Sequence, residues 1–493
     1  MEENQDTHLA RGRLPGDLRV RRIGRHARTL RRALGVPGLF SMIYANVGSS
    51  IYYALGVTAL YALGATPIVF FLAGIFFIFT ALSYVEGTAA IPEAGGASSF
   101  ARHGFNEFWS FFAGWAQILG YIVTISISAY TAVGYVGFFF PALENRFYHV
   151  ALTAFIILAL MVLNVRGVRE SSNFNVGITM FDLGTQIVLV ILGIFFLLNI
   201  KTLVSQVQWG VAPTWNQFIF SISIVMIAFT GIETTSNMAE EARDATRSIP
   251  RAIFWCVAFV LILFVGISSI SLSAMPVKFV DGHWTTDLAT KWINDPVAGI
   301  AASLPIASKF VSFWVALLAT TILIIATNAA IMGISRLTYS MGHYQQLPPI
   351  LSRVHKKFRT PHVAIIVFCI LGILLIIPAD IPKLADAYSF GAMLSYTIAN
   401  LSILALRIRD PKMKRPYKIS LNIKIKGREL PITSILGVIT TFTVWIIVAV
   451  THYYGRLIGI PFMIFGILLY LWYRKSRGLP IFETVKADKS KIY

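Results

Sequence analysis

Residues 44–52 read YANVGSSIY, and residues 228–236 read AFTGIETTS. Each segment places small and polar residues inside a stretch that is otherwise apolar and long enough to cross a membrane. Gly and Ser also occur in intact membrane helices, where they allow neighbouring helices to approach closely. Two interruptions at corresponding positions are instead typical of discontinuous helices that form a transporter's binding site near the bilayer midplane.

The composition indicates a membrane protein around these two segments. Of the 493 residues, 56% are hydrophobic and only 13% are charged, too few charges for a water-soluble surface. A spanning helix needs about 20 mostly apolar residues. We therefore predict an all-α integral membrane protein with twelve transmembrane helices. The predicted spans are 37–63, 67–91, 107–141, 149–165, 172–199, 215–240, 250–275, 307–341, 361–378, 383–408, 432–451 and 456–474.

The distribution of positive charge predicts the orientation. With twelve spans and a cytoplasmic N-terminus, 35 of the 42 Lys and Arg residues fall on the cytoplasmic side. This asymmetry follows the positive-inside rule, so both termini are expected in the cytoplasm and the protein in the cell membrane. The net charge of +19 therefore indicates topology and contact with membrane lipids, and no nucleic-acid partner is expected.

The first ten spans resemble each other as two sets of five. The third span of each set is longer than a bilayer requires, and the first span of each set carries the interruption. Because five is odd, the second set enters the membrane from the opposite side, which predicts a five-plus-five inverted repeat. The expected regions are a basic N-terminal tail (1–36), the transport core (37–410), a basic cytoplasmic loop (411–431), helices 11 and 12 (432–475) and a C-terminal tail (476–493).

The interruptions predict the substrate chemistry. The outer half of the first helix would begin near Ser49 with free N–H groups and positive dipole character, which suits a carboxylate. The upper half of the sixth helix would end near Ala228 with unpaired carbonyl groups, which suit an ammonium group. An α-amino acid carries both charges. The substrate-binding residues we predict, including three candidates from other pocket-lining helices, are Asn46, Val47, Gly48, Ser49, Ser50, Ile51, Ile227, Ala228, Phe229, Thr230, Gly231, Ile232, Tyr121, Thr124 and Asn328.

Three acidic residues lie within spans, where ionisable groups are costly and commonly mark an ion or proton path. Asp182 lies near the midplane of its span, and we expect it to take up and release a proton as access alternates. Glu233 begins the lower half of the sixth helix, where it acts in coupling or as a helix cap. Glu86 lies near the cytoplasmic end of the second span, so a structural pair with a basic loop residue is the alternative to coupling. Phe229 adjoins the break, and we expect it to cover the substrate.

Several short segments resemble the amino acid–polyamine–organocation superfamily of permeases. Residues 48–52 (GSSIY) are similar to that family's GSGIF, and residues 84–87 (YVEG) with 91–97 (IPEAGGA) are similar to its YAE and IPxAGG segment. The strongest similarity runs from 228 through 253, and 335–339, 404–411 and 415–417 add to it. Over residues 37–475 the resemblance implies the LeuT-like five-plus-five fold and alternating access, with the substrate held by helices 1 and 6.

Two departures from the family pattern leave alternatives open. The second Gly of GSGIF is Ser50, which narrows the approach of a carboxylate to the backbone but adds a hydroxyl. Asp182 occupies the place where many proton-coupled relatives have a Lys, so it would carry a proton or help hold a metal cation. We predict a secondary active amino acid transporter with proton-coupled symport. The alternatives are a transporter of potassium or of polyamines and, less favoured, a substrate-binding membrane sensor.

No motif of a soluble enzyme, nucleotide site or metal site occurs in the sequence. Cys256 and Cys369 fall inside spans without redox or metal spacing, so we expect them to pack as small apolar residues. The expected partners are therefore a small-molecule substrate, a proton or another coupling cation, and lipids. No cofactor, bound metal or enzymatic activity is expected.

Overall fold

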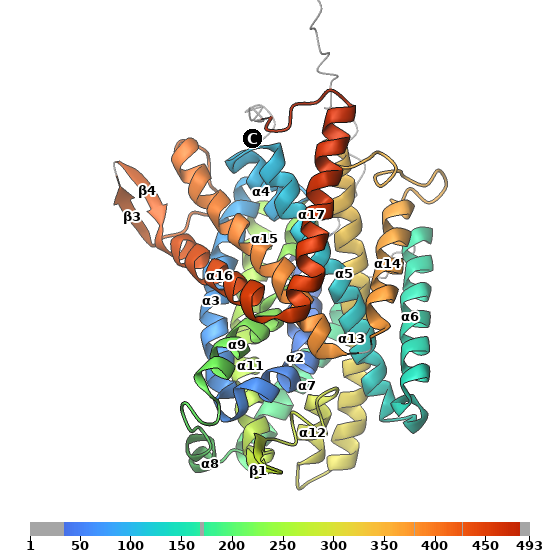
Figure 1. The fold of residues 1–493 in the computed structure, drawn as a ribbon, viewed down its shortest axis with the longest axis vertical. Helices are drawn as coiled ribbons and strands as arrows, with labels where there is room; N and C mark the ends of the chain where they lie inside the picture. Colours follow the sequence, from blue (N-terminus) through green and yellow to red (C-terminus); the bar gives the residue numbers. More distant parts are fainter. Residues whose placement is uncertain (1–33, 168–171, 379, 426, 484–493) are drawn as a thin grey trace, which may run out of the picture.

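The chain folds into a bundle of helices, seen in a computed structural model that describes residues 34–167, 172–378, 380–425 and 427–483 (Figure 1). Within these residues, ten helical segments are long and apolar enough to cross a membrane. The predicted all-helical membrane protein is therefore confirmed at this level. The Arg residues of the N-terminal tail lie outside the described residues, as do residues 484–493 of the C-terminal tail.

The helices agree with the predicted spans to within a few residues. In chain order they are α1 (Val36–Val47), α2 (Ile51–Ala62), α3 (Thr66–Ala90), α4 (Ala97–Gly104), α5 (Glu107–Gly137), α6 (Arg146–Arg166), α7 (Ser172–Phe196), α8 (Ile200–Ser205), α9 (Trp215–Val225), α10 (Glu233–Asn237), α11 (Ala245–Ala274), α12 (Pro296–Ala302), α13 (Ser308–His343), α14 (His362–Ile376), α15 (Ile381–Arg409), α16 (Ile432–Thr451) and α17 (Tyr453–Ser476).

In two segments the helices do not follow the simple pattern of one helix of ordinary length for each predicted span. The apolar run Val36–Ala90 has 55 residues, which would be about 80 Å long as one straight helix and is therefore too long for a single crossing. A turn at Leu63, with φ of 47°, ends α2 before α3 begins. At the other extreme, α14 has only 15 residues and is shorter than the span 361–378 predicted for it.

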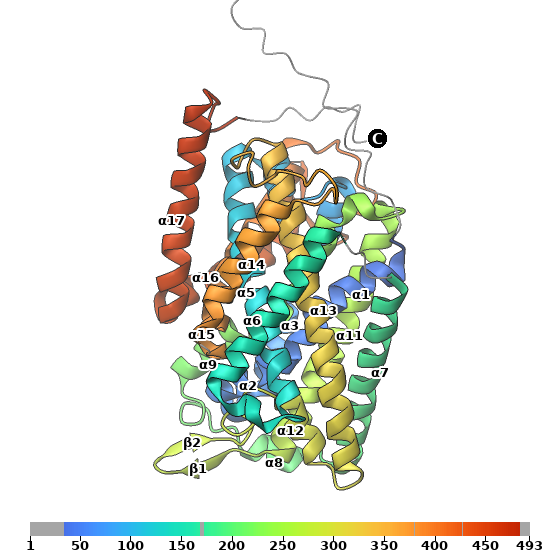
Figure 2. The same ribbon diagram turned by 90° about the vertical axis from the view of Figure 1, so that its right-hand side faces the viewer.

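Helix α5 lies at the centre of the bundle, against α13, α15, α14 and α6. It is the most thoroughly buried of the long helices, whereas α6, α7, α16 and α17 stand at the periphery (Figure 2). The peripheral helices expose large apolar side chains such as Phe155 and Phe195. Such a surface is stable against hydrocarbon and unfavourable in water, so it marks the lipid-facing side of the bundle.

Two short hairpins, absent from the all-helical prediction, lie at opposite ends of the molecule (Figure 1). Strands β1 (Lys278–Val280) and β2 (His283–Thr285) pair antiparallel at one end. Strands β3 (Asn422–Ile425) and β4 (Arg428–Pro431) pair antiparallel at the other. The hairpins lie in the loops 278–285 and 422–431. Each strand has only three or four residues, which is too short for an alternating hydrophobic pattern to predict it.

Candidate functional site

The sixth apolar span is broken as predicted, and the break lies at Thr230 and Gly231. Helix α9 ends at Val225 and tightens into a 3-10 turn over Met226–Phe229. Thr230 is then extended, with φ −109° and ψ 155°, and Gly231 has φ of 122° before α10 begins. A positive φ of this size is readily adopted only by glycine. The chain is therefore non-helical at this point inside an apolar span.

Gly231 is also required by packing. A Cβ atom added to it would lie 2.8 Å from the Cβ atom of Asn46 on α1. The 3-10 turns of the two interrupted helices, Gly48–Ser50 and Met226–Phe229, contact each other as well. The two sequence interruptions thus face each other across a close contact between backbones.

The first interruption differs from the prediction. Gly48–Ser50 forms a 3-10 turn between α1 and α2, and the backbone stays in the helical region, with φ −64° and ψ −34° at Gly48. The Ser49 hydroxyl donates to the Ala45 carbonyl at 2.5 Å, and the Ser50 hydroxyl donates to the Asn46 carbonyl at 2.9 Å. These bonds support a continuous helical path. The expected separation of this helix into two halves is therefore wrong for this conformation.

Polar side chains from three helices meet beside the Gly231 break. Asn46 Nδ2 donates to Thr234 Oγ1 at 2.7 Å, and Asn237 Nδ2 donates to the Tyr121 hydroxyl at 2.7 Å. The hydroxyls of Tyr121 and Thr234 lie 3.5 Å apart. The side-chain oxygens of Asn46 and Asn237 are buried and have no hydrogen-bond partner among the described residues. Buried acceptors of this kind suit a ligand that carries N–H groups.

Glu233 caps the short helix that follows the break. One of its oxygens, Oε2, accepts from the Gly231 N–H at 3.0 Å and from the Tyr396 hydroxyl at 2.7 Å. The same hydroxyl lies 3.2 Å from the Gly231 nitrogen. The helix-cap alternative for Glu233 is thus consistent with the geometry. Its coupling role stays a prediction.

Two tyrosines on α15 belong to this cluster, and the sequence prediction missed them. The Tyr396 hydroxyl donates to Glu233, and the Tyr388 hydroxyl interacts with the side chains of Thr124 and Thr230. They are eight residues apart and therefore lie on the same face of the helix, two turns from each other. This spacing in an apolar span was a signal that could have pointed to them. Tyr388 also brings Thr124, a predicted site residue, to the break.

Phe229 adjoins the break, as expected, and its side chain belongs to an aromatic cluster. Its ring packs against Phe70 and Phe77 of α3 and Phe264 of α11, with centroid distances of 6.3, 5.4 and 5.3 Å. The side chain therefore anchors the 3-10 turn in an aromatic cluster between these helices. The expectation that Phe229 covers the substrate stays a prediction, and it requires the ring to leave this cluster.

The carbonyl of Ile227 also differs from the expectation. It accepts from the Thr230 hydroxyl at 2.7 Å, so it is not one of the unpaired carbonyls. Val47 and Ile232, which were predicted with it, are fully buried beside the contact between α1 and α10.

Asp182 is completely buried on α7 and faces α2. Its Oδ1 accepts from the Tyr52 hydroxyl at 2.6 Å, and its Oδ2 accepts from Gln186 Nε2 at 2.9 Å. It takes part in none of the ion pairs found among the described residues. A carboxyl group buried without a cationic partner is costly to keep inside a membrane protein, and such groups commonly take part in a proton or ion path.

Glu86 is occupied by ion pairs. Nε and Nη2 of Arg407 donate to its two oxygens at 2.6 Å each, Arg415 Nε lies 3.4 Å away, and the Ile419 N–H donates at 2.9 Å. Both Glu86 and Arg407 are almost fully buried. This arrangement supports the structural alternative for Glu86.

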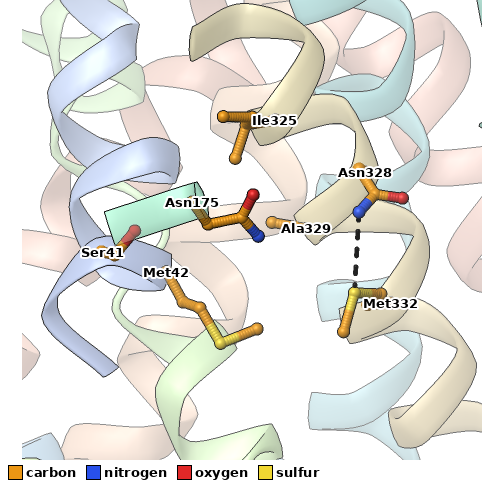
Figure 3. Close-up of a pocket in the computed structure, with 7 residues that line it drawn as sticks. All are labelled: Ser41, Met42, Asn175, Ile325, Asn328, Ala329 and Met332. Atoms are coloured by element: carbon orange, nitrogen blue, oxygen red, sulfur yellow. Dashed lines mark hydrogen bonds between the residues drawn. The ribbon is translucent and has the colours of Figure 1, made fainter. Parts of the chain in front are cut away.

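Asn328 lies away from the Gly231 break. Its Oδ1 accepts from Asn164 Nδ2 at 2.6 Å, and its Nδ2 points to the sulfur of Met332 at 3.8 Å (Figure 3). It lines a cavity of about 10 Å³ with Ser41 and Asn175, between α1, α7 and α13. That volume accommodates about one water molecule. An amino acid would fit there only after these helices separate.

No group of three or more His, Cys, Asp or Glu side chains that could hold a metal ion occurs within the residues the structure describes. The polar groups at the break are hydroxyls, amides and one carboxylate. This donor set is suited to reversible binding of a small polar molecule.

Comparison with known proteins gives a consistent picture. The family model described as amino acid permease matches residues 34–472. The chain is 29% identical over 362 residues to the low-affinity putrescine importer PlaP of Escherichia coli K12, covering 71% of this chain and 75% of the importer. It is 25% identical over 460 residues to the branched-chain amino acid permease BcaP of Bacillus subtilis, covering 87% and 93%. A methylthioribose transporter of Bacillus subtilis is 25% identical over 377 residues, covering 71% and 76%.

Proposed function

The chain belongs to the amino acid permease family, and we propose that it is a secondary active transporter that moves amino acids across the cell membrane by alternating access and proton symport. That it is a membrane transporter of small molecules, and not an enzyme, follows from the family and its relatives. The amino acid substrate and the coupled proton are the parts we propose.

The observation that carries the proposal is the non-helical backbone at Thr230 and Gly231, packed directly against Asn46. Irregular backbone inside a membrane protein is tolerated where it lines a cavity or contacts a ligand. The unpaired oxygens of Asn46 and Asn237 are positioned to accept from an ammonium group. A short 3-10 segment within a longer helix commonly acts as a hinge. We propose that the turn at Gly48–Ser50 opens on binding and that its N–H groups then meet the carboxylate.

The architecture we propose for this function has twelve spans with both termini in the cytoplasm. Residues 37–410 form a LeuT-like five-plus-five inverted repeat, and 432–475 add two helices to it. The near-equal lengths of α5 and α13 and the facing 3-10 turns support the repeat. The region 37–410 then holds every substrate contact, and 1–36, 411–431 and 476–493 are cytoplasmic.

For coupling, we propose that Asp182 carries the proton. It is buried, unpaired by any described cation, and hydrogen-bonded to Tyr52, which lies on the helix that follows the Gly48–Ser50 turn. A movement of α2 at this turn would change the surroundings of Asp182. Substrate binding and protonation are then linked through one helix.

A polyamine is the second candidate substrate, and a specific observation favours it. The putrescine importer PlaP is among the relatives, and a diamine would satisfy Glu233 and the amide oxygens of Asn46 and Asn237 without a carboxylate. In contrast to an amino acid, it needs nothing from Gly48–Ser50. The two candidates can therefore be separated by the ligand that binds.

The test is a ligand panel on the purified protein followed by uptake in proteoliposomes. Any ligand that binds the folded state raises its melting temperature, so amino acids, putrescine and potassium salts are compared at equal ionic strength. We expect stabilisation by at least one zwitterionic amino acid, lost in Asn46→Leu and kept in the remote variant Asn199→Ala. Accumulation of labelled rubidium or putrescine by a protein that binds no amino acid would overturn the proposal.

A further inference from the structure

The β3–β4 hairpin directly precedes a long apolar helix. Strand β4 ends at Pro431, and the apolar helix α16 begins at the next residue, Ile432. The hairpin therefore lies where a spanning helix leaves the bilayer. Figure 1 shows it projecting from the side of the bundle, beyond α16, at the end of the molecule where α17 also ends.

The hairpin is held in this position by its base. The Ile432 N–H donates to the Leu421 carbonyl at 2.9 Å, and the Ile419 N–H donates to Glu86 Oε2 at 2.9 Å. Ile419 itself is buried. The base of the hairpin is thus connected to the Glu86–Arg407 pair, so the strands project from a fixed point.

The two faces of the hairpin differ in chemistry. In the antiparallel register, Ile423 pairs with Leu430 and Ile425 pairs with Arg428, and each pair shares one face. Lys424 and Glu429 share the opposite face. The hairpin is therefore amphipathic, with two isoleucines on one side.

The apolar side is exposed to an unusual degree for a water-facing loop. Ile423 is 42% exposed and Ile425 is 48% exposed, and Leu421 before them is 60% exposed. Nothing else in the described chain covers them. Isolated exposed apolar residues are common, but three on one short projecting element form a surface that favours a less polar environment.

Positive charge surrounds this apolar side. Lys424 and Arg428 are exposed, whereas the one acidic residue of the strands, Glu429, is paired with Lys418. Hydrogen bonding to Lys418 lowers the pKa of Glu429 from its usual value, so the Glu429 carboxylate stays ionised at neutral pH. An amphipathic element with apolar residues and exposed cations at a membrane boundary matches the chemistry of an anionic bilayer surface.

We propose that the β3–β4 hairpin docks onto the cytoplasmic leaflet, with Ile423 and Ile425 in the headgroup region and with Lys424 and Arg428 on the phosphate groups of anionic lipids. An acidic protein would satisfy the cations equally, but the exposed isoleucines at the start of a spanning helix favour the bilayer. This role does not depend on which substrate the protein carries.

The first experiment measures the depth of each face. The full-length protein carries an environment-sensitive fluorophore on Ile425→Cys or, as the matched control on the other face, Lys424→Cys. Cys256 and Cys369 are buried, so background labelling is low. In nanodiscs of phosphatidylcholine with phosphatidylglycerol, we expect the label at 425 to shift to the blue and to be quenched by headgroup-linked nitroxide lipids. The label at 424, on the opposite face, should lie nearer the water, with a smaller blue shift and weaker quenching than the label at 425.

The second experiment tests the charge. Removing Lys424 and Arg428 together (K424Q/R428Q) should reduce the retention of phosphatidylglycerol in native mass spectrometry by about fivefold for each cation. Lys278→Gln, on the hairpin at the opposite end, is the control and should leave retention unchanged. All three positions are exposed, so the fold is not disturbed.

Specific outcomes would overturn the proposal. A label at 425 that stays aqueous in every lipid mixture would show that the hairpin does not enter the bilayer. Shielding of that label by soluble poly-glutamate, with none in anionic nanodiscs, would indicate a protein partner instead. An equal effect of inorganic phosphate in pure phosphatidylcholine would indicate a site for the free anion. Failure of amino acid transport would affect none of these readouts.

Discussion

At the scale of single residues, Gly231 is subject to two independent requirements. Its φ of 122° lies in a region that residues with a Cβ atom rarely adopt, and its missing side chain lets α10 approach Asn46 on α1. Either requirement alone would favour glycine. Together they mean that any substitution must change both the backbone path and the contact between the two interrupted helices.

We expect Gly231→Ala to destabilise the protein by about 1–3 kcal/mol through backbone strain and to reduce uptake to background. Thermal unfolding in detergent and uptake in proteoliposomes measure the two effects. Gly177→Ala on α7 is the matched control, because a Cβ atom there meets no neighbour within 4 Å. Wild-type stability and uptake in Gly231→Ala would contradict the assignment of the break as the binding site.

Asp182 is the residue to which we assign coupling. Asp182→Asn keeps the shape of the side chain and its contact with Tyr52 but cannot ionise. We expect this variant to lose uptake driven by a pH gradient while it still exchanges labelled for unlabelled substrate across proteoliposome membranes. Tyr52→Phe removes the hydrogen bond and keeps the acid, so gradient-driven uptake should persist at a lower rate. Unchanged gradient-driven uptake in Asp182→Asn would exclude the residue from the mechanism.

At the scale of elements, the interrupted helices show what the sequence can and cannot specify. The small polar clusters at 44–52 and 228–236 correctly indicated where both helices depart from regular geometry. They did not indicate how far each departs, since Ser49 and Ser50 return their hydroxyls to carbonyls of the preceding turn and keep the helix intact. The second cluster breaks fully because Gly231 takes a positive φ and Glu233 caps the next turn.

The side chains around the break were harder to predict because their partners are far away in the sequence. Tyr396 reaches Glu233 across 163 positions, and Arg407 reaches Glu86 across 321. The three aromatic neighbours of Phe229 come from α3 and α11, so its surroundings depend on how these helices pack, which the sequence does not show. Periodicity and composition identify helices and their faces, but they do not specify which face meets which.

The Glu86–Arg407 ion pair connects α3 to α15, and its loss should lower the free energy of unfolding. We expect Glu86→Gln to destabilise the protein by about 3–5 kcal/mol, because it leaves a buried guanidinium without a counter-charge. The matched control is Asp287→Asn, which breaks the half-exposed pair with Lys278 and should cost about 0–1 kcal/mol. Thermal unfolding compares the two. A stable Glu86→Gln protein with altered pH dependence of uptake would instead favour a coupling role for Glu86.

At the scale of the whole molecule, the number of crossings is the property on which the inverted repeat depends. Ten segments are long and apolar enough by themselves in the described chain, and the sequence predicts twelve because it divides Val36–Ala90 in two and counts α14. The 55-residue length of Val36–Ala90 and the turn at Leu63 require this run to be divided into two spans. Length alone does not require α14 to cross the membrane, since 15 residues span about 22 Å of a hydrocarbon core of about 30 Å.

The two hairpins allow this count to be tested directly. Between β1 and β3 the chain contains α13, α14 and α15, so the hairpins lie on opposite sides of the membrane only if all three helices cross it. We expect an impermeant maleimide to label Lys278→Cys in intact cells and to label Lys424→Cys only after permeabilisation, with the wild type as control. Labelling of both from outside would mean that α14 does not cross. The chain would then have an even number of crossings between its hairpins, and the second half could not be an inverted copy of the first.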